Sequence, residues 1–284
     1  MEKIISFFTS LSLIISYILG FGSITTDGDY QLVRKEKLNS AVSICSAQGL
    51  CCDGEYFYAS GALSAINITG LAKYDLDMKC VKMKLNAVPA EFTKKYGSNH
   101  IGGIDCANGY IYASVEGKLE GDYKYNFILL YDCDTLEYTG KYYDLTSEHL
   151  TDGIPWCAID KEGGFLYTSK YNNAGEILQY SIEDMSLVKC IPLKQEVSRI
   201  QGGSFYNGTL YLSYDVAHST DEQILAVNLN DGSVTAEITR HLPNYDNEAE
   251  DICFCPLNDG TLVHTLDYDK LLNVNVMHYK STLD

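Results

Sequence analysis

The chain has 284 residues, of which 46% are hydrophobic and 12% aromatic, so it can bury a sizeable core and does not belong to the intrinsically disordered class. Its 38 acidic residues outnumber its 21 basic residues, which gives a net charge of −17. A surface this acidic should repel nucleic acid and anionic lipid; it favours cations as partners, or simply keeps the protein soluble.

Residues 1–22 have the features of a signal peptide. Lys3 is followed by an apolar run over 4–21, and the sequence GFG at 20–22 gives the small-x-small pattern that a signal peptidase requires. A run of about 17 apolar residues can also just span a bilayer, so an uncleaved membrane anchor is the alternative. In both cases we expect an extracellular or outward-facing protein that contacts the membrane only through this segment.

A strand is predicted next over Asp29–Leu38, and its sequence DYQLVRKEKL matches none of the segments that follow. After it, one hairpin pattern occurs five times: a turn of Asn-Gly, Asp-Gly or Gly-Gly precedes a strand with alternating aromatic residues. The turns and second strands are DGEYFYAS from Asp53, NGYIYAS from Asn108, GGFLYTS from Gly163, NGTLYLS from Asn207 and DGTLVHT from Asp259.

Two further strands follow most of these hairpins. Third strands are predicted to begin at Gly70, Phe127, Glu176, Gln223 and Leu271. Fourth strands are predicted to begin at Lys79, Glu137, Ser186 and Ser233. The fifth unit has no fourth strand of its own. A repeat of four strands over roughly 50 residues is typical of a β-propeller blade.

The sequence therefore predicts an all-β fold, a five-bladed β-propeller with four-stranded antiparallel blades, formed by residues 29–284 as one domain. The strand Asp29–Leu38 is predicted to pair with the strand that begins at Leu271, to complete the last blade and so to close the ring. Closure hides sheet edges that an open array of blades would expose.

Ten cysteines in an exported protein first suggest disulfides. However, Cys52, Cys106 and Cys157 occupy similar places in the repeats, where an apolar residue would serve, and Cys253 and Cys255 point to one face of a strand. We therefore predict that most of the ten are reduced and buried, as small apolar side chains.

One polar residue precedes or begins each predicted innermost strand. These residues are Gln48, His100, Asp152, Gln201 and Glu250. Because equivalent positions in five blades are related by rotation, the five side chains should converge at one mouth of the central channel. Such a ring can bind a ligand, or it can simply hydrate a water-filled channel.

A metal ion is one candidate ligand of this ring. Carboxylate and amide oxygens suit a hard cation such as Ca²⁺, and the predicted ligand set is Asp152, Glu250 and His100. His100 beside Asp152 can instead act as a general base. Trp156, the single tryptophan, can wall the mouth against a ligand or pack in the core.

Acidic loops are expected to surround the same mouth as a solvated rim or a binding site. They contribute Glu116, Glu120, Asp122, Asp215, His218, Asp221, Glu222, Asp246, Glu248 and Asp251.

The first blade resembles the opening blade of the glutamine cyclotransferase family of five-bladed propellers found in plants and bacteria. The shared features are the QGL step at 48–50, the Asp-Gly turn at 53–54, the Tyr-x-Ser ending at 58–60 and the Lys-x-Asp-Leu third strand at 73–76. The whole chain resembles the broad group of exported propellers with YVTN, NHL or SMP-30-type blades. Several members of that group bind a divalent metal in the channel, which is what this second resemblance implies here.

The predicted function is binding of a small ligand or a divalent cation at the central channel of an exported or surface-associated monomer. The alternative is an enzyme, either a metal-dependent hydrolase of the lactonase or esterase type or a glutaminyl-peptide cyclotransferase. A platform that binds another protein is the third hypothesis. Nucleic acid is not an expected partner, because the chain is strongly acidic.

Overall fold

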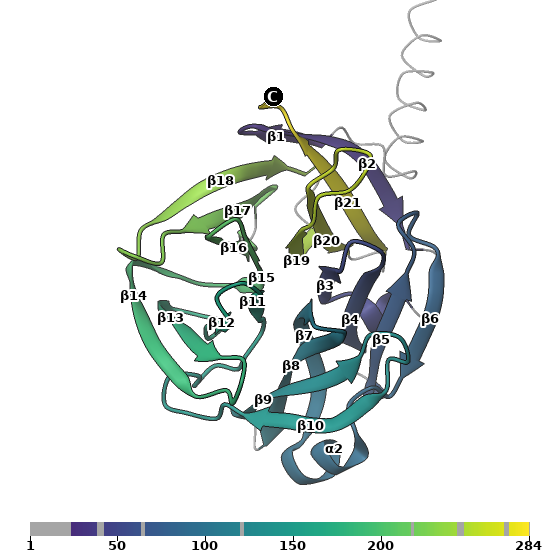
Figure 1. The fold of residues 1–284 in the computed structure, drawn as a ribbon, viewed down its shortest axis with the longest axis vertical. Helices are drawn as coiled ribbons and strands as arrows, with labels where there is room; N and C mark the ends of the chain where they lie inside the picture. The colour runs from purple at the N-terminus through teal and green to yellow at the C-terminus, as the bar shows by residue number, and fades with distance from the viewer. Residues whose placement is uncertain are drawn as a thin grey trace, which may run out of the picture.

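Five antiparallel sheets stand around a common axis in the computed structural model, which describes residues 24–38, 43–63, 66–119, 122–216, 219–242, 247–269 and 273–283. In each sheet the first strand lies nearest the axis and the last lies at the outside (Figure 1). The prediction of an all-β, five-bladed propeller with four-stranded blades is therefore confirmed.

The blades follow the chain in order. Blade 1 contains β3 (Gly49–Cys52), β4 (Phe57–Leu63), β5 (Ile68–Tyr74) and β6 (Cys80–Leu85). Blade 2 contains β7 (Ser98–Ala107), β8 (Tyr110–Leu119), β9 (Asp122–Asp132) and β10 (Tyr138–Asp144). Blade 3 contains β11 (Ala158–Asp160), β12 (Phe165–Thr168), β13 (Ala174–Ser181) and β14 (Leu187–Val197). Blade 4 contains β15 (Ile200–Tyr206), β16 (Thr209–Tyr214), β17 (Asp221–Val227) and β18 (Val234–His241). Blade 5 contains β19 (Asn247–Phe254), β20 (Val263–Asp269), β21 (Val274–Ser281) and the N-terminal β2 (Tyr30–Lys37).

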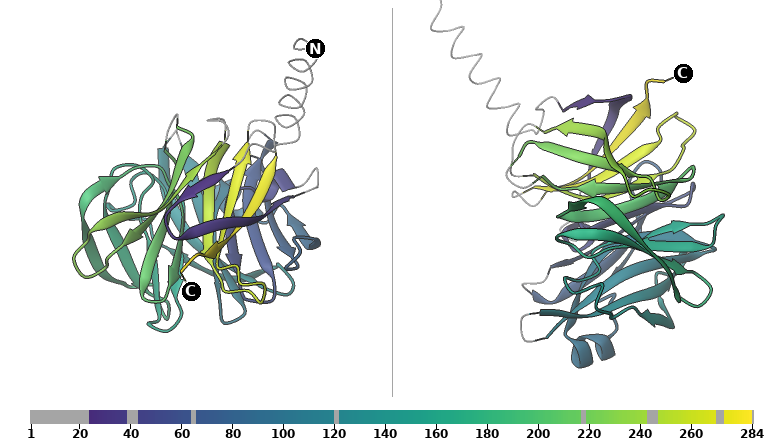
Figure 2. Two further views of the ribbon diagram at one scale, coloured as in Figure 1. Left: turned by 90° about the horizontal axis from the view of Figure 1, so that it is seen from above. Right: turned by 90° about the vertical axis from the view of Figure 1, so that its left-hand side faces the viewer.

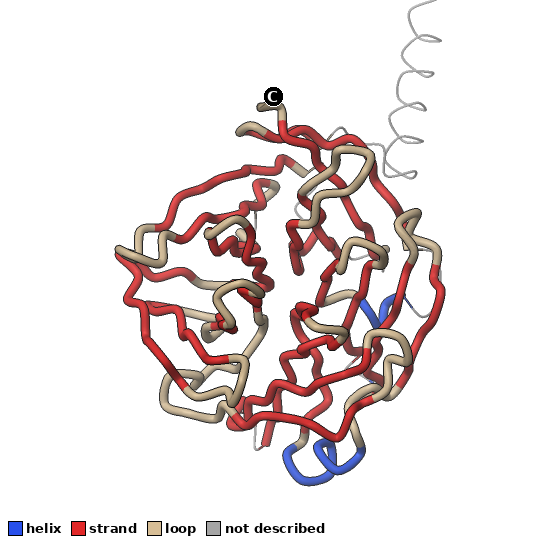
Figure 3. Tube along the Cα trace, in the orientation of Figure 1, coloured by secondary structure: helices blue, strands red, loops and turns tan. Residues whose placement is uncertain are grey.

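Helices are a minor part of the fold (Figure 3). A 3-10 turn η1 (Ser43–Ser46) lies between β2 of blade 5 and β3 of blade 1, and a short helix α2 (Ala90–Tyr96) lies between β6 of blade 1 and β7 of blade 2. No helix in the described ranges is long and apolar enough to cross a membrane. The predicted export segment, residues 1–22, lies outside the described residues.

The two Asn-Gly hairpin turns form as the dipeptide predicts. Asn108 and Gly109 have φ of 53° and 79°, and Asn207 and Gly208 have φ of 48° and 79°. Two consecutive positive φ angles define the tight turn whose twist matches that of the flanking strands, and asparagine followed by glycine adopts them at low cost.

The N-terminal strand closes the ring. Strand β2 pairs antiparallel with β21, from Tyr30 opposite Ser281 to Lys37 opposite Asn275, which confirms the predicted closure. A preceding strand, β1 (Thr25–Asp27), pairs with the outermost strand of blade 4. Figure 2 shows these two strands in purple across the outside of the ring, between the green and yellow blades. The N-terminal segment thus joins blades 4 and 5, and strand structure begins before Asp29.

The apolar core lies between neighbouring blades, where facing sheets bury their side chains. All ten cysteines are free in the structure, as predicted. Eight of them are buried, whereas Cys80 is exposed and Cys190 is intermediate. The buried thiols share these clusters with aliphatic and aromatic side chains, for example Cys51 and Cys106 beside Ile104 between blades 1 and 2.

At the axis, one buried carboxylate joins the innermost strands of four blades. Asp251 has no exposed surface. Its Oδ2 accepts hydrogen bonds from the backbone N–H groups of Leu50, at 2.9 Å, and Ile104, at 3.2 Å. Its Oδ1 accepts from Gly203, at 3.0 Å, and Ile252, at 2.9 Å. Burial raises the pKa of Asp251 well above its usual range, and the backbone N–H groups oppose that rise.

Blade 3 joins the same arrangement through blade 2. Asp105 Oδ2 accepts a hydrogen bond from Ile159 N at 2.7 Å, and Gly103 N donates to Pro155 O at 2.7 Å. Burial raises the pKa of Asp105 to about 6. All five innermost strands are thus linked by hydrogen bonds near the axis.

Glycine is needed where these strands meet. A β-carbon on Gly102 would lie 2.2 Å from Pro155 O, and one on Gly202 would lie 2.0 Å from Asp251 Oδ1. Neither neighbour can move away without breaking the axial contacts, so any side chain at these two positions would push the blades apart.

Ring closure by β2 predicts a difference between two neighbouring residues of that strand. Leu32 packs against the cluster of blades 4 and 5, whereas Val33 is 50% exposed. We expect Leu32→Asp to lower the free energy of unfolding by roughly 1–3 kcal/mol, because it places a carboxylate against apolar side chains. Val33→Asp should change it by less than about 0.5 kcal/mol. Urea unfolding measures both; equal effects would contradict the assigned register.

The axial carboxylate makes a second prediction. Asp251→Asn leaves one acceptor oxygen for four N–H donors and turns an amide N–H₂ towards two of them, so we expect a loss of roughly 2–5 kcal/mol in the free energy of unfolding. The matched control is Asp75→Asn, because Asp75 accepts the N–H groups of Asp77 and Lys79 with a single oxygen that asparagine retains. A thermal melt of Asp251→Asn that matches the control would show that Asp251 does not hold the ring together.

Candidate functional site

Three of the five predicted mouth residues form a continuous hydrogen-bonded chain. Gln48, directly before β3, donates from Nε2 to Glu250 Oε1 at 2.9 Å. His100 of β7 lies with Nε2 2.7 Å from Gln48 Oε1. Because the Gln48 amide gives its N–H to Glu250, its oxygen faces the imidazole, and this orientation requires the proton of His100 on Nε2. Blades 5, 1 and 2 are thus connected through side chains.

Glu116 of β8 extends the chain towards blade 3. His100 Nδ1 lies 3.1 Å from Glu116 Oε2, within ion-pair distance but not aligned as a hydrogen bond. Glu116 packs against Gly153, where a β-carbon would lie 2.0 Å from Glu116 Oε1. Asp152, which precedes Gly153, accepts hydrogen bonds at Oδ2 from the backbone N–H and the side-chain amide of Asn172. Asp152 therefore contacts its own blade, beside Glu116 and not in direct contact with Gln48 or Glu250.

Blade 4 contributes an ion pair that sequence analysis did not predict. Arg199 Nη2 pairs with the Asp215 carboxylate and lies 3.6 Å from Glu248 Oε1. The predicted mouth residue Gln201 donates to that same Glu248 at 3.4 Å. Glu248 is two residues before Glu250 on β19. The ring therefore continues from blade 5 to blade 4.

Tyr171 closes the circle between blades 4 and 3. Its backbone N–H donates to Asp152 O at 3.3 Å, and its carbonyl accepts from Ile200 N at 3.4 Å. The Arg199 guanidinium carbon lies 6.0 Å from the centre of the Tyr171 ring. Sequence analysis missed Tyr171 because the repeat does not place a tyrosine there, and it missed Arg199. The sequence around Arg199, LKQEVSRIQGG, gives no signal of an ion pair, because Asp215 and Glu248 lie 16 and 49 residues away in the chain.

The mouth carries more negative than positive charge. Burial raises the pKa of Glu250 well above its usual range, and the charges of Glu248 and Asp215 raise it further. The pKa of Glu248 is raised by burial and by Asp215, while Arg199 opposes the rise. These carboxylates compete for one guanidinium. The mouth therefore favours a further positive charge or protonation of its acids.

A second buried charge cluster lies beneath the mouth in blades 4 and 5. Arg240 has no exposed surface, and its Nη1 donates to Asp267 at 2.8 and 2.9 Å. Glu222 is 1% exposed and accepts a hydrogen bond from Val216 N. Burial, together with the charge of Asp215, raises the pKa of Glu222 to about 8.

Several loop carboxylates are buried, which corrects the prediction of a solvated acidic rim. Glu116, Asp215, Glu222 and Asp251 are at most 4% exposed. Asp215, Glu222 and Asp251 each accept a side-chain or backbone donor, and Glu116 lies 3.1 Å from His100 Nδ1. Among the other predicted rim residues, Asp221 forms a hydrogen bond with His241 on the outer side of blade 4, between Oδ1 and Nδ1 at 2.8 Å. Glu120, His218 and Asp246 lie outside the described residues.

Trp156 does not wall the mouth, contrary to one of its two predicted roles. Its side chain is fully buried, and its Nε1 donates to Ser169 Oγ at 3.2 Å. It packs beside Gly103 and Gly203 near the axis. Core packing, the alternative prediction, describes its position, because the missing side chains of two glycines provide the space for the indole.

The predicted metal ligands are not gathered into a preformed site. Groups of three or more potential ligands within 4.8 Å of one another, among the described residues, are Cys51 with Asp105 and Cys106, and His149 with Glu176 and Cys190. Neither group includes His100, Asp152 or Glu250. Both nitrogens of His100 already face Gln48 and Glu116, so a metal at the mouth would have to displace one of them.

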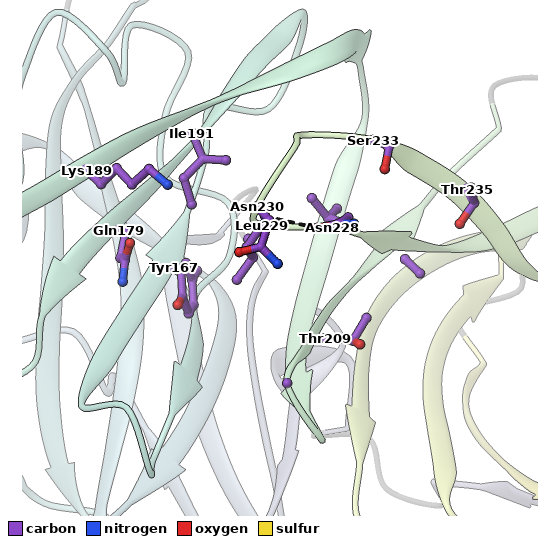
Figure 4. A pocket seen from close by; sticks show the side chains of 13 residues that line it. Tyr167, Gln179, Lys189, Ile191, Thr209, Asn228, Leu229, Asn230, Ser233 and Thr235 are labelled. Carbon is purple, nitrogen blue, oxygen red and sulfur yellow. Dashed lines mark hydrogen bonds between the residues drawn. The ribbon is translucent and has the colours of Figure 1, made fainter.

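Two surface cavities lie at different distances from this ring. One of about 560 Å³ is lined by Asp152, Tyr123 and Lys118 and adjoins the mouth between blades 2 and 3. Another of about 670 Å³ lies between blades 3 and 4, where Tyr167, Gln179 and Asn230 are among the lining residues (Figure 4). The second is lined by the β15–β16 turn, at the opposite end of β15 from Gln201, and does not include the mouth residues.

No protein-family model matches the chain, and no curated protein sequence matches it. Solved structures that resemble it include the mitotic checkpoint complex, with 10% identity over 83% of this chain and a TM-score of 0.41. The hydrazine synthase of Kuenenia stuttgartiensis has 12% identity over 80% of this chain and a TM-score of 0.44. The nidogen/laminin complex has 11% identity over 78% of this chain and 75% of that chain, with a TM-score of 0.48.

The chain spans 63% and 57% of the first two of these structures. At such identities and TM-scores the likeness says nothing about function, and the propeller assignment rests on the observed strand order. The resemblance of the first blade to glutamine cyclotransferases, and of the chain to YVTN, NHL or SMP-30-type propellers, is not confirmed by a family match.

The raised pKa of Glu222 predicts how stability depends on pH. Between the ordinary glutamate pKa of about 4.3 and the folded value of about 8, the folded protein binds more protons than the unfolded chain. The contribution of Glu222 to the free energy of unfolding therefore falls as pH rises through this window. We expect Glu222→Gln to flatten the fall between pH 6 and pH 8.5 in urea unfolding. Glu91→Gln, on the exposed first turn of α2, should leave the slope unchanged.

Proposed function

We propose that the channel mouth binds a small, positively charged ligand. The observation that carries this proposal is the gathering of polar side chains from the blades at the mouth, in which the carboxylates outnumber the cationic groups. Arg199 is shared between Asp215 and Glu248, while Glu250 is buried with only a neutral amide as its partner. A ligand cation would stabilise the ionised form of these acids and bind more tightly as they ionise.

The strength of the repulsion between neighbouring carboxylates favours a cation over a neutral ligand. Two like charges about 4 Å apart interact by roughly 4 kcal/mol at an effective dielectric of 20, so a single added positive charge removes a substantial repulsion. The ring is accessible from solvent at several points: the side chains of His100, Arg199 and Glu248 are 23%, 33% and 44% exposed. A ligand can therefore reach Glu248 without opening the blades, and its charge can act from there on the buried Glu250 and Asp215.

The positive charge can belong to a divalent cation or to an organic ammonium group. Carboxylate and glutamine oxygens suit Ca²⁺, as the sequence predicted. The absence of a compact three-ligand group at the described part of the mouth favours the larger ammonium. The aromatic face of Tyr171, which already stands near a guanidinium, is a further surface on which an ammonium group binds well.

The proposal places this binding protein outside the cell, as a monomer. The location is inferred from the signal-peptide features of residues 1–22. The monomeric state is inferred from the closed ring, in which β2 covers the edge of blade 5. A small molecule, or a protein that presents a lysine or an N-terminal amine, has the chemistry that the mouth recognises.

A second candidate function is proton transfer on an amine-bearing substrate. The pair of His100 and Glu116 next to Gln48 is the observation that favours it, because an imidazole between a carboxylate and an amide can move a proton at Nε2 or Nδ1. Cyclisation of an N-terminal glutamine fits this chemistry: the α-amine attacks the side-chain amide carbon and ammonia leaves with a proton. Release of ammonia from a glutaminyl dipeptide, lost in His100→Gln, tests this alternative.

The binding proposal is tested by thermal melts at constant ionic strength. One arm adds millimolar Ca²⁺, Mg²⁺, Mn²⁺ or Zn²⁺, and another adds a primary diamine such as putrescine, with butanediol as the neutral control. We expect the melting temperature to rise in at least one arm. Glu248→Gln with Glu250→Gln should abolish the rise, because both variants keep an acceptor oxygen but lose the charge.

The matched control is Glu55→Gln, an exposed acid in the first hairpin turn that should retain the full rise. A rise with the diamine alone assigns an organic ammonium, and a rise with one divalent ion alone assigns a metal. Melting curves that do not move in either arm would refute cation binding at the mouth.

A further inference from the structure

A second cluster of potential ligands lies at blade 3, away from the mouth ring. His149 Nδ1, a carboxylate oxygen of Glu176 and the sulfur of Cys190 all lie within 4.8 Å of one another. His149 Nδ1 is 2.7 Å from Glu176 Oε1. Neither the propeller repeat nor the proposed mouth function accounts for an imidazole, a carboxylate and a thiol at one point.

Two of the three groups are held by the sheet itself. Glu176 is on β13, opposite Pro192, and Cys190 is on β14, opposite Leu178. Residues two apart on one strand share a face, so Glu176 and Cys190 are diagonal neighbours on the same side of the pair. The ladder is regular between these two positions, since its shifts fall before Glu176 and after Gln179. The distance between them is therefore fixed by strand pairing in the outer half of blade 3 (Figure 1).

The third group comes from another part of the chain. His149 lies in the connection between β10 and β11, which leads from blade 2 into blade 3. The imidazole and carboxylate side chains are 29% and 35% exposed, and Cys190 is half-buried. An ion can therefore reach all three from solvent, and a short movement of the connection is enough to adjust the imidazole.

The donor set selects a particular class of metal. Nitrogen, carboxylate oxygen and thiolate sulfur together suit Zn²⁺ and similar borderline transition metals, and not Ca²⁺ or Mg²⁺, which take oxygen ligands. Around a tetrahedral zinc ion the donor atoms stand roughly 3.3–3.7 Å apart, given metal–ligand lengths of about 2.0–2.3 Å. The imidazole and carboxylate need to separate by only about half an ångström, and the sulfur, which lies within 4.8 Å of both, needs to approach by at most roughly 1.5 Å.

A fourth position is available beside the cluster. A cavity of about 260 Å³ is lined by His149 and Glu176 together with Ser169, Lys170, Asn173 and Glu196. Three protein ligands and one open position that faces a polar cavity form the arrangement in which zinc keeps a water molecule or takes a ligand.

We propose that His149, Glu176 and Cys190 form a zinc-type transition-metal site, open to a small ligand at its fourth position. The other thiol-containing group, Cys51 with Asp105 and Cys106, is not chosen. It is largely buried, and the Asp105 carboxylate already accepts hydrogen bonds from Ile159 N and Cys106 N. At blade 3 the three donors bond mainly to one another.

Cobalt titration of the purified, reduced full chain tests this site, because Co²⁺ reports thiolate ligation through a near-ultraviolet charge-transfer band. We expect one equivalent of Co²⁺ to produce the band. Added Zn²⁺ should displace the Co²⁺ and so remove the band. Cys190→Ser should remove the band, and Glu176→Gln should weaken Co²⁺ affinity at least tenfold while leaving the band visible at high cobalt. Cys80→Ser removes an exposed thiol elsewhere and should change neither property.

The variants separate this site from misfolding and from the mouth. A thermal melt of each metal-free variant shows whether the ring is intact, and Glu176→Gln on an exposed face is expected to melt as the parent does. Absence of the band in the parent chain, or its survival in Cys190→Ser, would overturn the proposal. Cobalt binding to the parent chain without the thiolate band, lost in the Glu248→Gln and Glu250→Gln double variant, would overturn the proposal and place the metal at the mouth.

Discussion

The structure depends on one interaction, the acceptance of four backbone N–H groups by the Asp251 carboxylate at the propeller axis. Innermost strands of different blades cannot pair with one another as a sheet, so their N–H groups would otherwise be buried without acceptors. A single carboxylate with no exposed surface satisfies donors from blades 1, 2, 4 and 5 at once. Asp105 performs the same task for blade 3. The requirement for glycine at Gly102 and Gly202 follows directly, because no side chain fits where strands approach a shared acceptor.

The same convergence explains why the mouth is charged and rigid. The innermost strands converge at the axis, so side chains at or before their first residues lie close together. Gln48, His100 and Glu250 meet there and form hydrogen bonds. The strands that carry the polar ring are anchored by Asp251, which binds Leu50 N two residues after Gln48, Ile104 N four residues after His100 and Gly203 N two residues after Gln201. Such preorganisation lowers the entropic cost of binding a ligand, since few side chains need to be ordered. Its other consequence is a set of buried acids with raised pKa values, which stay partly protonated until a cation or an alkaline solution ionises them.

Closure by the N-terminal strands decides how the rest of the ring is protected. Strand β2 completes blade 5 and β1 pairs with the edge strand of blade 4. The N-terminal segment, which is distant in sequence, therefore joins these two neighbouring blades. In the outer half of blade 3, the β13–β14 pair presents Glu176 and Cys190 beside His149. The interior of the propeller thus confers stability, while its two polar clusters, at the mouth and on blade 3, remain accessible for binding.

The sequence alone determined the features that repeat. Five hairpins with Asn-Gly, Asp-Gly or Gly-Gly turns, the strand order, the free buried cysteines and the pairing of β2 with β21 could all be predicted, because local turn chemistry and the period-2 pattern act within each blade. The meeting of Gln48, His100 and Glu250 followed from rotational equivalence. What only the tertiary structure decided are contacts between blades, where no sequence period operates. From the sequence, Asp251 was expected at the acidic rim of the mouth, and one of the two roles predicted for Trp156 was to line the mouth. Glu116, Arg199 and Tyr171 join the ring only because the blades are rotated into contact.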